Sequence, residues 1–185
     1  MILIVNVCSD RLGYFEFVKP VEDILKKAGE DFLTRHFLSL NCRDVSRAEK
    51  AIICGTALRD FEYLDMIEKF AWIRKADVPI LGICAGMQVL ARLFGSNLVE
   101  KTKIGRYKVK VVLKSILTYK NEFYSYFLNS RAVELNEDFE TLGESGNVKC
   151  MIRHRRKRLY GCLFHPEALN PEIIANFLQQ LIPQM

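Results

Sequence analysis

The stretch that decides the fold lies between residues 78 and 88 and reads Val78-Pro79-Ile80-Leu81-Gly82-Ile83-Cys84-Ala85-Gly86-Met87-Gln88. Residues 78–83 form a short apolar run typical of a buried strand, and residues 85–94 are apolar nearly all round, which predicts a central buried helix. A cysteine stands at the junction, with a glycine two residues before it and another two residues after it. This is the cysteine counterpart of the G-x-S-x-G nucleophile elbow, a sharp strand-to-helix turn.

The spacing of the two glycines has a physical reason. Such a turn holds its nucleophile in a strained backbone conformation, and strand and helix approach so closely that only glycine fits at the flanks. Cys84 would then begin the helix, where free backbone N–H groups favour the thiolate and where the N–H of Ala85 can bind an oxyanion. We therefore predict that Cys84 is a nucleophile. The alternative is a small buried residue at a tight turn, which we expect for Cys8 and Cys54.

Working outward from this turn, short β-branched runs alternate with helical patterns. Extended runs are expected at 2–7, 32–37, 51–54 and 78–83, and helices at 17–28, 61–75 and 85–94. Further extended runs at 107–113, 132–135, 148–153 and 159–164 are followed by a closing helix that Pro183 ends. We expect one α/β domain over residues 1–185, an open, mostly parallel sheet flanked by helices with an additional antiparallel β section.

Composition limits the class of protein. The chain has 185 residues, of which 50% are hydrophobic and 26% charged, and a net charge of +5. This predicts a single folded domain with no membrane span and no secretory signal. None of the six cysteines forms a C-x-x-C pair, so we expect reduced thiols and a cytoplasmic location. The positive charge is spread along the chain except at 153–158, so nucleic acid is not an expected partner.

A cysteine nucleophile needs a base, and the chain has three histidines. His36 lies in a strand-like run and is expected to be a structural or edge residue. His154 belongs to the basic cluster at 153–158, which is expected to be a solvated turn rather than a binding patch. His165 ends an extended run and is followed by Pro166 and Glu167, so Cys84, His165 and Glu167 are the expected triad.

These motifs resemble those of class I, triad-type glutamine amidotransferases. The elbow at 82–88 and Phe164-His165-Pro166-Glu167 are similar to the family's two motifs, in the same order, and the similarity extends over nearly the whole chain. The resemblance implies a flavodoxin-like core. It also implies that Cys84 attacks the carboxamide of L-glutamine, that His165 acts as base and acid, and that Glu167 orients the imidazole. A glutamyl thioester would be hydrolysed to glutamate, and ammonia would be released without any metal or other cofactor.

The resemblance also assigns residues that bind the substrate. Gln88 would contact the glutamine, although it could simply be a polar residue in the first turn of a helix. Ser130 would offer main-chain groups to the amino-acid end of the glutamine. The family usually has two glycines after its third strand, and here only one is present, so either Gly55 or Thr56 would complete the oxyanion hole.

The sequence leaves several functions open. The expected one is a stand-alone glutaminase subunit that passes ammonia to a separate synthetase or synthase, because the strand-and-helix scaffold, the elbow and the triad together use nearly every residue of the chain. Among such subunits those of two-subunit GMP synthases are favoured over those of anthranilate synthase-type enzymes. The alternatives are a non-catalytic or weakly active regulatory partner and a γ-glutamyl hydrolase-type enzyme. The acceptor of the ammonia, the oligomeric state and the role of the basic cluster at 153–158 are not determined by the sequence.

Overall fold

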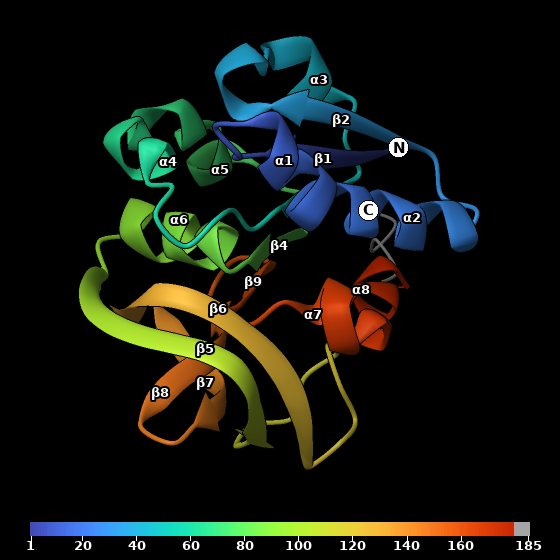
Figure 1. The fold of residues 1–185 in the computed structure, drawn as a ribbon. Coiled ribbons are helices and arrows are strands. Elements are labelled where there is room, and N and C mark those ends of the chain that lie inside the picture. The colour runs from blue at the N-terminus through green and yellow to red at the C-terminus, as the bar shows by residue number, and fades with distance from the viewer. Residues whose placement is uncertain (180–185) are drawn as a thin grey trace.

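The computed structural model describes residues 1–179 (Figure 1). The strands are β1 (Ile2–Asn6), β2 (Phe32–His36), β3 (Lys50–Ile53), β4 (Ile80–Ile83), β5 (Asn97–Val111), β6 (Glu122–Glu134), β7 (Phe139–Ser145), β8 (Val148–His154) and β9 (Leu159–Cys162). The α-helices are α1 (Arg11–Gly13), α2 (Lys19–Lys27), α3 (Cys42–Ser46), α4 (Glu62–Asp65), α5 (Trp72–Lys75), α6 (Ala85–Leu93), α7 (Pro166–Leu169) and α8 (Pro171–Leu178). A π-helical segment, η1 (Tyr14–Val18), and two 3-10 segments, η2 (Phe37–Ser39) and η3 (Ile67–Phe70), complete this part of the chain.

Within the described residues the strands form one sheet in the order β2-β1-β3-β4-β9-β8-β7-β5-β6. Strands β2, β1, β3, β4 and β9 run parallel to their neighbours in this half of the sheet. From β9 through β8, β7, β5 and β6 each pair is antiparallel. The predicted α/β fold, a parallel sheet with an antiparallel section, is confirmed.

Helices cover both faces of the parallel half because its strands are apolar on both faces. Ile2 and Ile4 of β1 belong to a core that also contains the apolar residues of α2 and α8. Leu3 and Val5 point the opposite way, into a second core with buried residues of α4, η3, α5 and α6. Figure 1 shows α2 and α8 on one side of the parallel strands and α4, α5 and α6 on the other.

The prediction of one continuous helix over 61–75 is wrong. This segment forms three short pieces, α4, η3 and α5, with a break at Met66, whose φ of −109° and ψ of 32° lie outside the helical region. The buried residues of this segment are Tyr63, Phe70 and Ile73. Phe61, Leu64 and Ile67, which would form an apolar stripe on a continuous helix, stay only partly buried. Tertiary packing has therefore overridden the helical periodicity.

The antiparallel section is larger than predicted. Strand β5 begins at Asn97 rather than at 107, β6 is a 13-residue strand rather than the short run at 132–135, and β7 was not predicted. Long twisted antiparallel strands tolerate exposed polar residues on one face, so their hydrophobic signal is weak. The closing helix is observed as α8, but Pro183, which was predicted to end it, lies outside the described residues.

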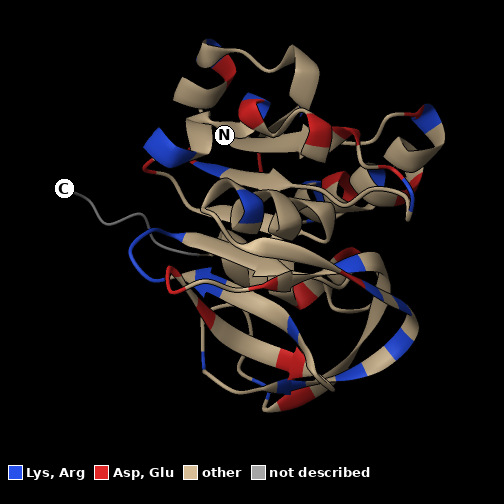
Figure 2. Cartoon of the chain, turned by 90° about the vertical axis from the view of Figure 1, so that its left-hand side faces the viewer, with Lys and Arg blue, Asp and Glu red and all other residues tan. Residues whose placement is uncertain are grey.

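The basic cluster at 153–158 differs in one respect from the expected solvated turn. Arg156 is 83% exposed and pairs with Asp138, while the side chains of Arg153 and Arg155 both pair with Glu140. His154, however, is buried between the rings of Phe94 and Phe139, and burial lowers its pKa. Its Nδ1 accepts hydrogen bonds from two backbone N–H groups of the turn, which explains why a histidine sits there. Elsewhere, acidic and basic residues are interspersed over the chain (Figure 2).

Two other sequence predictions concern single side chains. His36 lies on β2, the edge strand, and its Nε2 is 3.0 Å from the carbonyl oxygen of Cys8, so its structural role is confirmed. All six cysteines are in the described part of the chain and are free thiols, and every one except Cys42 is buried. No helix in residues 1–179 is long and apolar enough to cross a membrane.

Candidate functional site

The residues predicted to carry the chemistry leave neighbouring strands at one edge of the sheet. In the parallel register Ile53 of β3 pairs with Gly82 of β4, and Ile83 of β4 pairs with Cys162 of β9. Gly55, Cys84 and His165 therefore follow the carboxyl ends of three adjacent strands. Sites in open α/β sheets form at this edge.

Cys84 adopts the strained conformation expected of an elbow. Its φ is 47° and its ψ is −100°, and it is the one residue other than glycine with a positive φ in residues 1–179. The Cys84 N–H donates to the carbonyl of Cys162, at 2.7 Å, and its own carbonyl accepts from the N–H of Gln88, at 3.1 Å. These bonds hold the strained turn from both sides, at the residue that immediately precedes α6.

The predicted need for glycine at both flanks is confirmed. A Cβ on Gly82 would lie 2.4 Å from the backbone carbon of Gly86, and a Cβ on Gly86 would lie 2.2 Å from the carbonyl oxygen of Ile53. Both obstacles are main-chain atoms, which cannot move aside as a flexible side chain can. The two glycines therefore permit the close approach of α6 to β3 and β4.

The structure brings His165 and Glu167 together. His165 Nδ1 lies 2.7 Å from Glu167 Oε1, and both side chains are only 3% exposed. The backbone N–H of His165 donates to the backbone carbonyl of Tyr126 on β6, at 2.8 Å, and this bond fixes the loop that carries the imidazole. With Nδ1 protonated toward the carboxylate, Nε2 is left as the reactive nitrogen, and it has no hydrogen-bond partner among the described residues.

Charges around His165 set its protonation. Burial by itself lowers the pKa of His165, but the Glu167 carboxylate and the Cys84 sulfur together outweigh it, so the pKa lies well above the usual value. Burial also raises the pKa of the Cys8 thiol to about 11 and that of the Cys150 thiol to about 12. Those two are neutral near pH 7 and are packing residues, as predicted for Cys8.

Gly55 lies directly against the two reactive side chains. A Cβ at this position would be 2.6 Å from Cε1 of His165 and 3.4 Å from Cβ of Cys84. Gly55 and Thr56 are both buried, and within residues 1–179 neither backbone N–H donates to another group. The Thr56 hydroxyl donates to Asp60, at 2.6 Å, which orders the loop. Two free amides, together with that of Ala85 in the first turn of α6, are thus available beside Cys84.

Gln88 is buried and its carboxamide is engaged on both sides. Its Oε1 accepts from the hydroxyl of Tyr63, at 2.6 Å, and its Nε2 donates to the carbonyl of Arg131, at 3.2 Å. The side chain therefore ties α6 to α4 and β6. Ser130 lies next to Arg131 on β6, and its hydroxyl donates to the carbonyl of Leu58, at 3.1 Å.

Sequence reasoning assigned Ser130 of β6 to the site but missed Leu128 of the same strand and Phe17 of η1. The thiol of Cys84 lies 3.6 Å from the carbonyl oxygen of Leu128 on β6. The Phe17 ring of η1 lies 5.3 Å from the His165 ring, and both border a cavity of about 150 Å³ with Tyr126 and Leu128. No local motif marks these residues, because they reach the site only through the pairing of distant segments.

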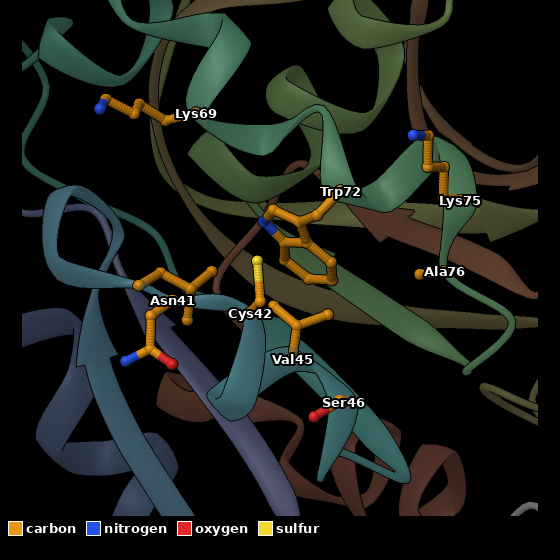
Figure 3. A pocket seen from close by; sticks show the side chains of 9 residues that line it. Asn41, Cys42, Val45, Ser46, Lys69, Trp72, Lys75 and Ala76 are labelled. Atoms are coloured by element: carbon orange, nitrogen blue, oxygen red, sulfur yellow. The ribbon is translucent and has the colours of Figure 1, made fainter.

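The apolar hollow in Figure 3 lies elsewhere. It has a volume of about 410 Å³ and is bordered by residues of α3, η3 and α5, among them Val45 and Trp72. Figure 3 shows Lys69 and Lys75 extending away from Trp72. None of the candidate residues described above borders this hollow, so it is not part of the site.

Comparison with known proteins identifies the family to which the chain is related. The family model of class-I glutamine amidotransferases matches residues 38–181. The glutamine-hydrolysing GMP synthase of Aquifex aeolicus is 36% identical over 116 residues, which cover 57% of this chain and 23% of that protein. One subunit of the glutamine-hydrolysing GMP synthase of Archaeoglobus fulgidus is 34% identical over 119 residues, or 58% of this chain and 64% of its own length.

The aligned part thus spans less than two thirds of either relative. Among solved structures, a protein from Thermoplasma acidophilum described as a GMP synthase subunit superimposes with a TM-score of 0.84 at 22% identity, over 96% of this chain and 92% of that one. This likeness shows a shared fold, and the family model covers well over half of the sequence. The chain belongs to the class-I glutamine amidotransferase family.

Proposed function

We propose that this protein is a glutaminase subunit that hydrolyses L-glutamine to glutamate and ammonia and passes the ammonia to a separate synthetase. The observation that supports this best is the meeting of Cys84, His165 and Glu167 at the ends of β4 and β9. A strained cysteine at a helix N-terminus, with a buried His–Glu pair 2.7 Å apart beside it, has the components of cysteine-based acyl transfer.

In the proposed first step the Cys84 sulfur attacks the side-chain carboxamide carbon of glutamine. The oxygen of the tetrahedral intermediate accepts hydrogen bonds from the amide of Ala85 and from that of Gly55 or Thr56. His165 gives its proton to the departing nitrogen, which leaves as ammonia, and a γ-glutamyl thioester remains on Cys84.

In the second step His165 takes a proton from water, which attacks the thioester carbon. The carbon–sulfur bond breaks, glutamate leaves, and the thiolate is restored. Glu167 keeps the imidazole in the tautomer with Nδ1 protonated, so Nε2 can serve both steps. Gln88 and the main chain at Ser130 bind the amino-acid portion of the substrate. The chemistry of these residues requires neither a metal nor an organic cofactor.

The proposed acceptor is the partner subunit of a two-subunit GMP synthase. The Archaeoglobus relative is named as one subunit of a glutamine-hydrolysing GMP synthase, and this supports a two-subunit enzyme. The presence of Cys84, His165 and Glu167 supports an enzyme over the alternative of a regulatory partner, whereas the single glycine after β3 favours that alternative.

The test is release of glutamate and ammonia from L-glutamine by the purified chain, alone and with cell extract, against Cys84→Ala. We expect both products in equal amounts from the wild type and none from the variant. Release that survives the substitution would exclude Cys84 as the nucleophile, and no release under either condition would support the regulatory alternative. Comparison of L-glutamine with a γ-glutamyl anilide would identify a γ-glutamyl hydrolase by preference for the anilide.

A further inference from the structure

A single carboxylate oxygen holds the loop that carries Gly55 and Thr56. Oδ2 of Asp60 accepts two hydrogen bonds, one from the hydroxyl of Thr56 at 2.6 Å and one from the backbone N–H of Ser9 at 2.8 Å. Ser9 lies in the loop that follows β1, whereas Thr56 and Asp60 lie in the loop that follows β3. The Asp60 side chain therefore ties these two loops to each other.

The position of Asp60 is itself fixed by the rest of its loop. The backbone N–H of Asp60 donates to the carbonyl of Ala57, at 3.0 Å, and this bond closes a turn. The carbonyl of Leu58 in the same turn accepts from the hydroxyl of Ser130 on β6, at 3.1 Å. The hydroxyl of Thr56 is thus bonded to a carboxylate that is anchored both to the loop after β1 and to β6.

The direction of the Gly55 carbonyl indicates which amide faces the reactive sulfur. This carbonyl accepts from the thiol of Cys8, with the sulfur 3.6 Å away, and burial raises the pKa of that thiol to about 11, so it keeps its proton. The peptide bonds within residues 1–179 are all trans, so the N–H of Thr56 points opposite to the Gly55 carbonyl and away from Cys8. Strand β3 lies between β1, which precedes Cys8, and β4, which precedes Cys84. That direction therefore leads toward Cys84.

The hydroxyl bond restricts rotation of this peptide group. Thr56 is buried, and no group within residues 1–179 accepts from its backbone N–H. Its hydroxyl and its amide are attached to the same Cα, so the bond to Asp60 holds both in one orientation. An amide that is oriented before the oxyanion forms does not have to reorganise during the reaction.

We propose that Asp60 is a positioning residue for the oxyanion hole, which acts through the Thr56 hydroxyl to keep the Thr56 amide directed at the tetrahedral intermediate. The inference rests on the proposed glutaminase function and adds to it a residue outside the triad. Because Asp60 acts through Thr56 and not on the substrate itself, its removal raises the energy of the transition state and leaves substrate binding as it is.

Paired substitutions separate this role from a general loss of stability. Asp60→Ala removes both hydrogen bonds, whereas Asp60→Asn keeps an oxygen that can accept them. Thr56→Val removes the hydroxyl alone, and Thr56→Ser retains it. Thr34→Val is the matched control, because the Thr34 hydroxyl also donates to a carboxylate, that of Glu22 at 2.7 Å, but on the edge strand β2.

Steady-state release of glutamate from L-glutamine is measured under the conditions of the Cys84→Ala test. We expect kcat to fall about tenfold or more in Asp60→Ala and Thr56→Val, with KM changed by less than about threefold, because an oxyanion donor acts in the transition state. Asp60→Asn and Thr56→Ser should keep kcat within about threefold of the wild type. Thr34→Val should lower the melting temperature and leave kcat unchanged.

Several results would overturn the inference. These are a wild-type kcat in Asp60→Ala, a loss carried by KM, no rescue by the conservative variants, or an equal loss of kcat in Thr34→Val. If Asp60→Ala shows no cooperative melting transition, Thr56→Val and Thr56→Ser decide the outcome. No release by the wild type would contradict the glutaminase proposal and this inference with it, whereas an unchanged Asp60→Ala beside an active wild type overturns the inference alone.

Discussion

At the scale of single residues, the strained backbone of Cys84 is the feature that most needs explanation. A residue other than glycine at a φ of 47° costs about 1–3 kcal/mol and persists only where its surroundings enforce it. In this chain the conformation of Cys84 is held by the hydrogen bond from its backbone N–H to the carbonyl of Cys162 and by the close approach of α6 to β3. We propose that this conformation directs the Cys84 sulfur away from the backbone and toward His165 and the free amide groups.

The raised pKa of His165 predicts how the rate depends on pH. The proton given to the departing nitrogen is present below this pKa, so kcat/KM is expected to fall as the pH rises through it. Glu167→Gln removes the carboxylate that raises the pKa, so the alkaline fall should begin at a lower pH, and kcat/KM should drop about 100-fold or more. Steady-state kinetics over a pH series checks this. An alkaline fall that stays in place, or moves upward, would contradict the assigned role of Glu167.

At this scale the sequence predicts only what a local motif contains. Cys84, His165 and Glu167 lie in short motifs. His165 and Glu167 are two residues apart, so the 2.7 Å contact between His165 Nδ1 and Glu167 Oε1 follows from local geometry. The carbonyl of Leu128, the ring of Phe17 and the stacking of Arg131 on Phe61 depend on which distant segments pair. Residue types alone carry no signal for those contacts.

At the scale of elements, the packing of α6 against the strands is set by Gly86. A methyl group there would lie 2.2 Å from a carbonyl oxygen of β3, so the helix would have to move. Gly86→Ala is expected to lower the free energy of unfolding by about 2 kcal/mol or more, measured by urea titration. Gly143→Ala is the matched control, because its methyl group would first meet the sulfur of the flexible Met151 side chain, at 3.0 Å, and the loss should be smaller. Equal losses would contradict this reason for the glycine.

The hydroxyl of Tyr63 fastens α4 to α6. Tyr63→Phe leaves Oε1 of the buried Gln88 without its donor, so the free energy of unfolding should fall by about 1–2 kcal/mol. Tyr119 is 84% exposed, and Tyr119→Phe should change the stability by less than about 0.5 kcal/mol. Denaturant titration of both variants checks this, and an unaltered stability of Tyr63→Phe would show that the bond contributes nothing.

The same contact shows why the predicted helix over 61–75 failed. The stripe of Phe61, Leu64 and Ile67 has helical spacing, but the core requires Tyr63 to face Gln88. The chain satisfies that contact by breaking at Met66. Strand–helix alternation around β1 to α6 was predictable because buried parallel strands are continuous apolar runs, whereas the half-exposed β5, β6 and β7 are not.

At the scale of the whole molecule, one sheet connects the parallel and antiparallel halves through the β9–β8 pair. We expect residues 1–185 to unfold as one cooperative unit. The fluorescence of Trp72, the chain's single tryptophan, and far-UV circular dichroism should therefore give coincident urea transitions. Trp72 lies on α5, beside the parallel half. A second transition seen only by circular dichroism would show that the antiparallel section unfolds independently.

The site also depends on both halves of the sheet. Cys84 and Gly55 follow parallel strands, while Leu128, Ser130 and Arg131 belong to β6 at the far end of the antiparallel section. The antiparallel section curls so that β6 lies over the edge of the parallel strands. The backbone hydrogen bond from His165 to Tyr126 connects β6 to the loop that follows β9. The proposed substrate site is therefore complete only in the folded whole.

The most direct test of the central proposal is to trap the thioester. The wild-type chain is mixed with L-glutamine labelled with carbon-13 and quenched in acid within the first turnover, and its peptides are analysed by mass spectrometry. We predict a labelled glutamyl group on the peptide that contains Cys84, removable by hydroxylamine, and none in His165→Ala or Cys84→Ala controls. Labelled glutamate formed while Cys84 stays unmodified through the time course, or neither product under any condition, would contradict the proposed mechanism.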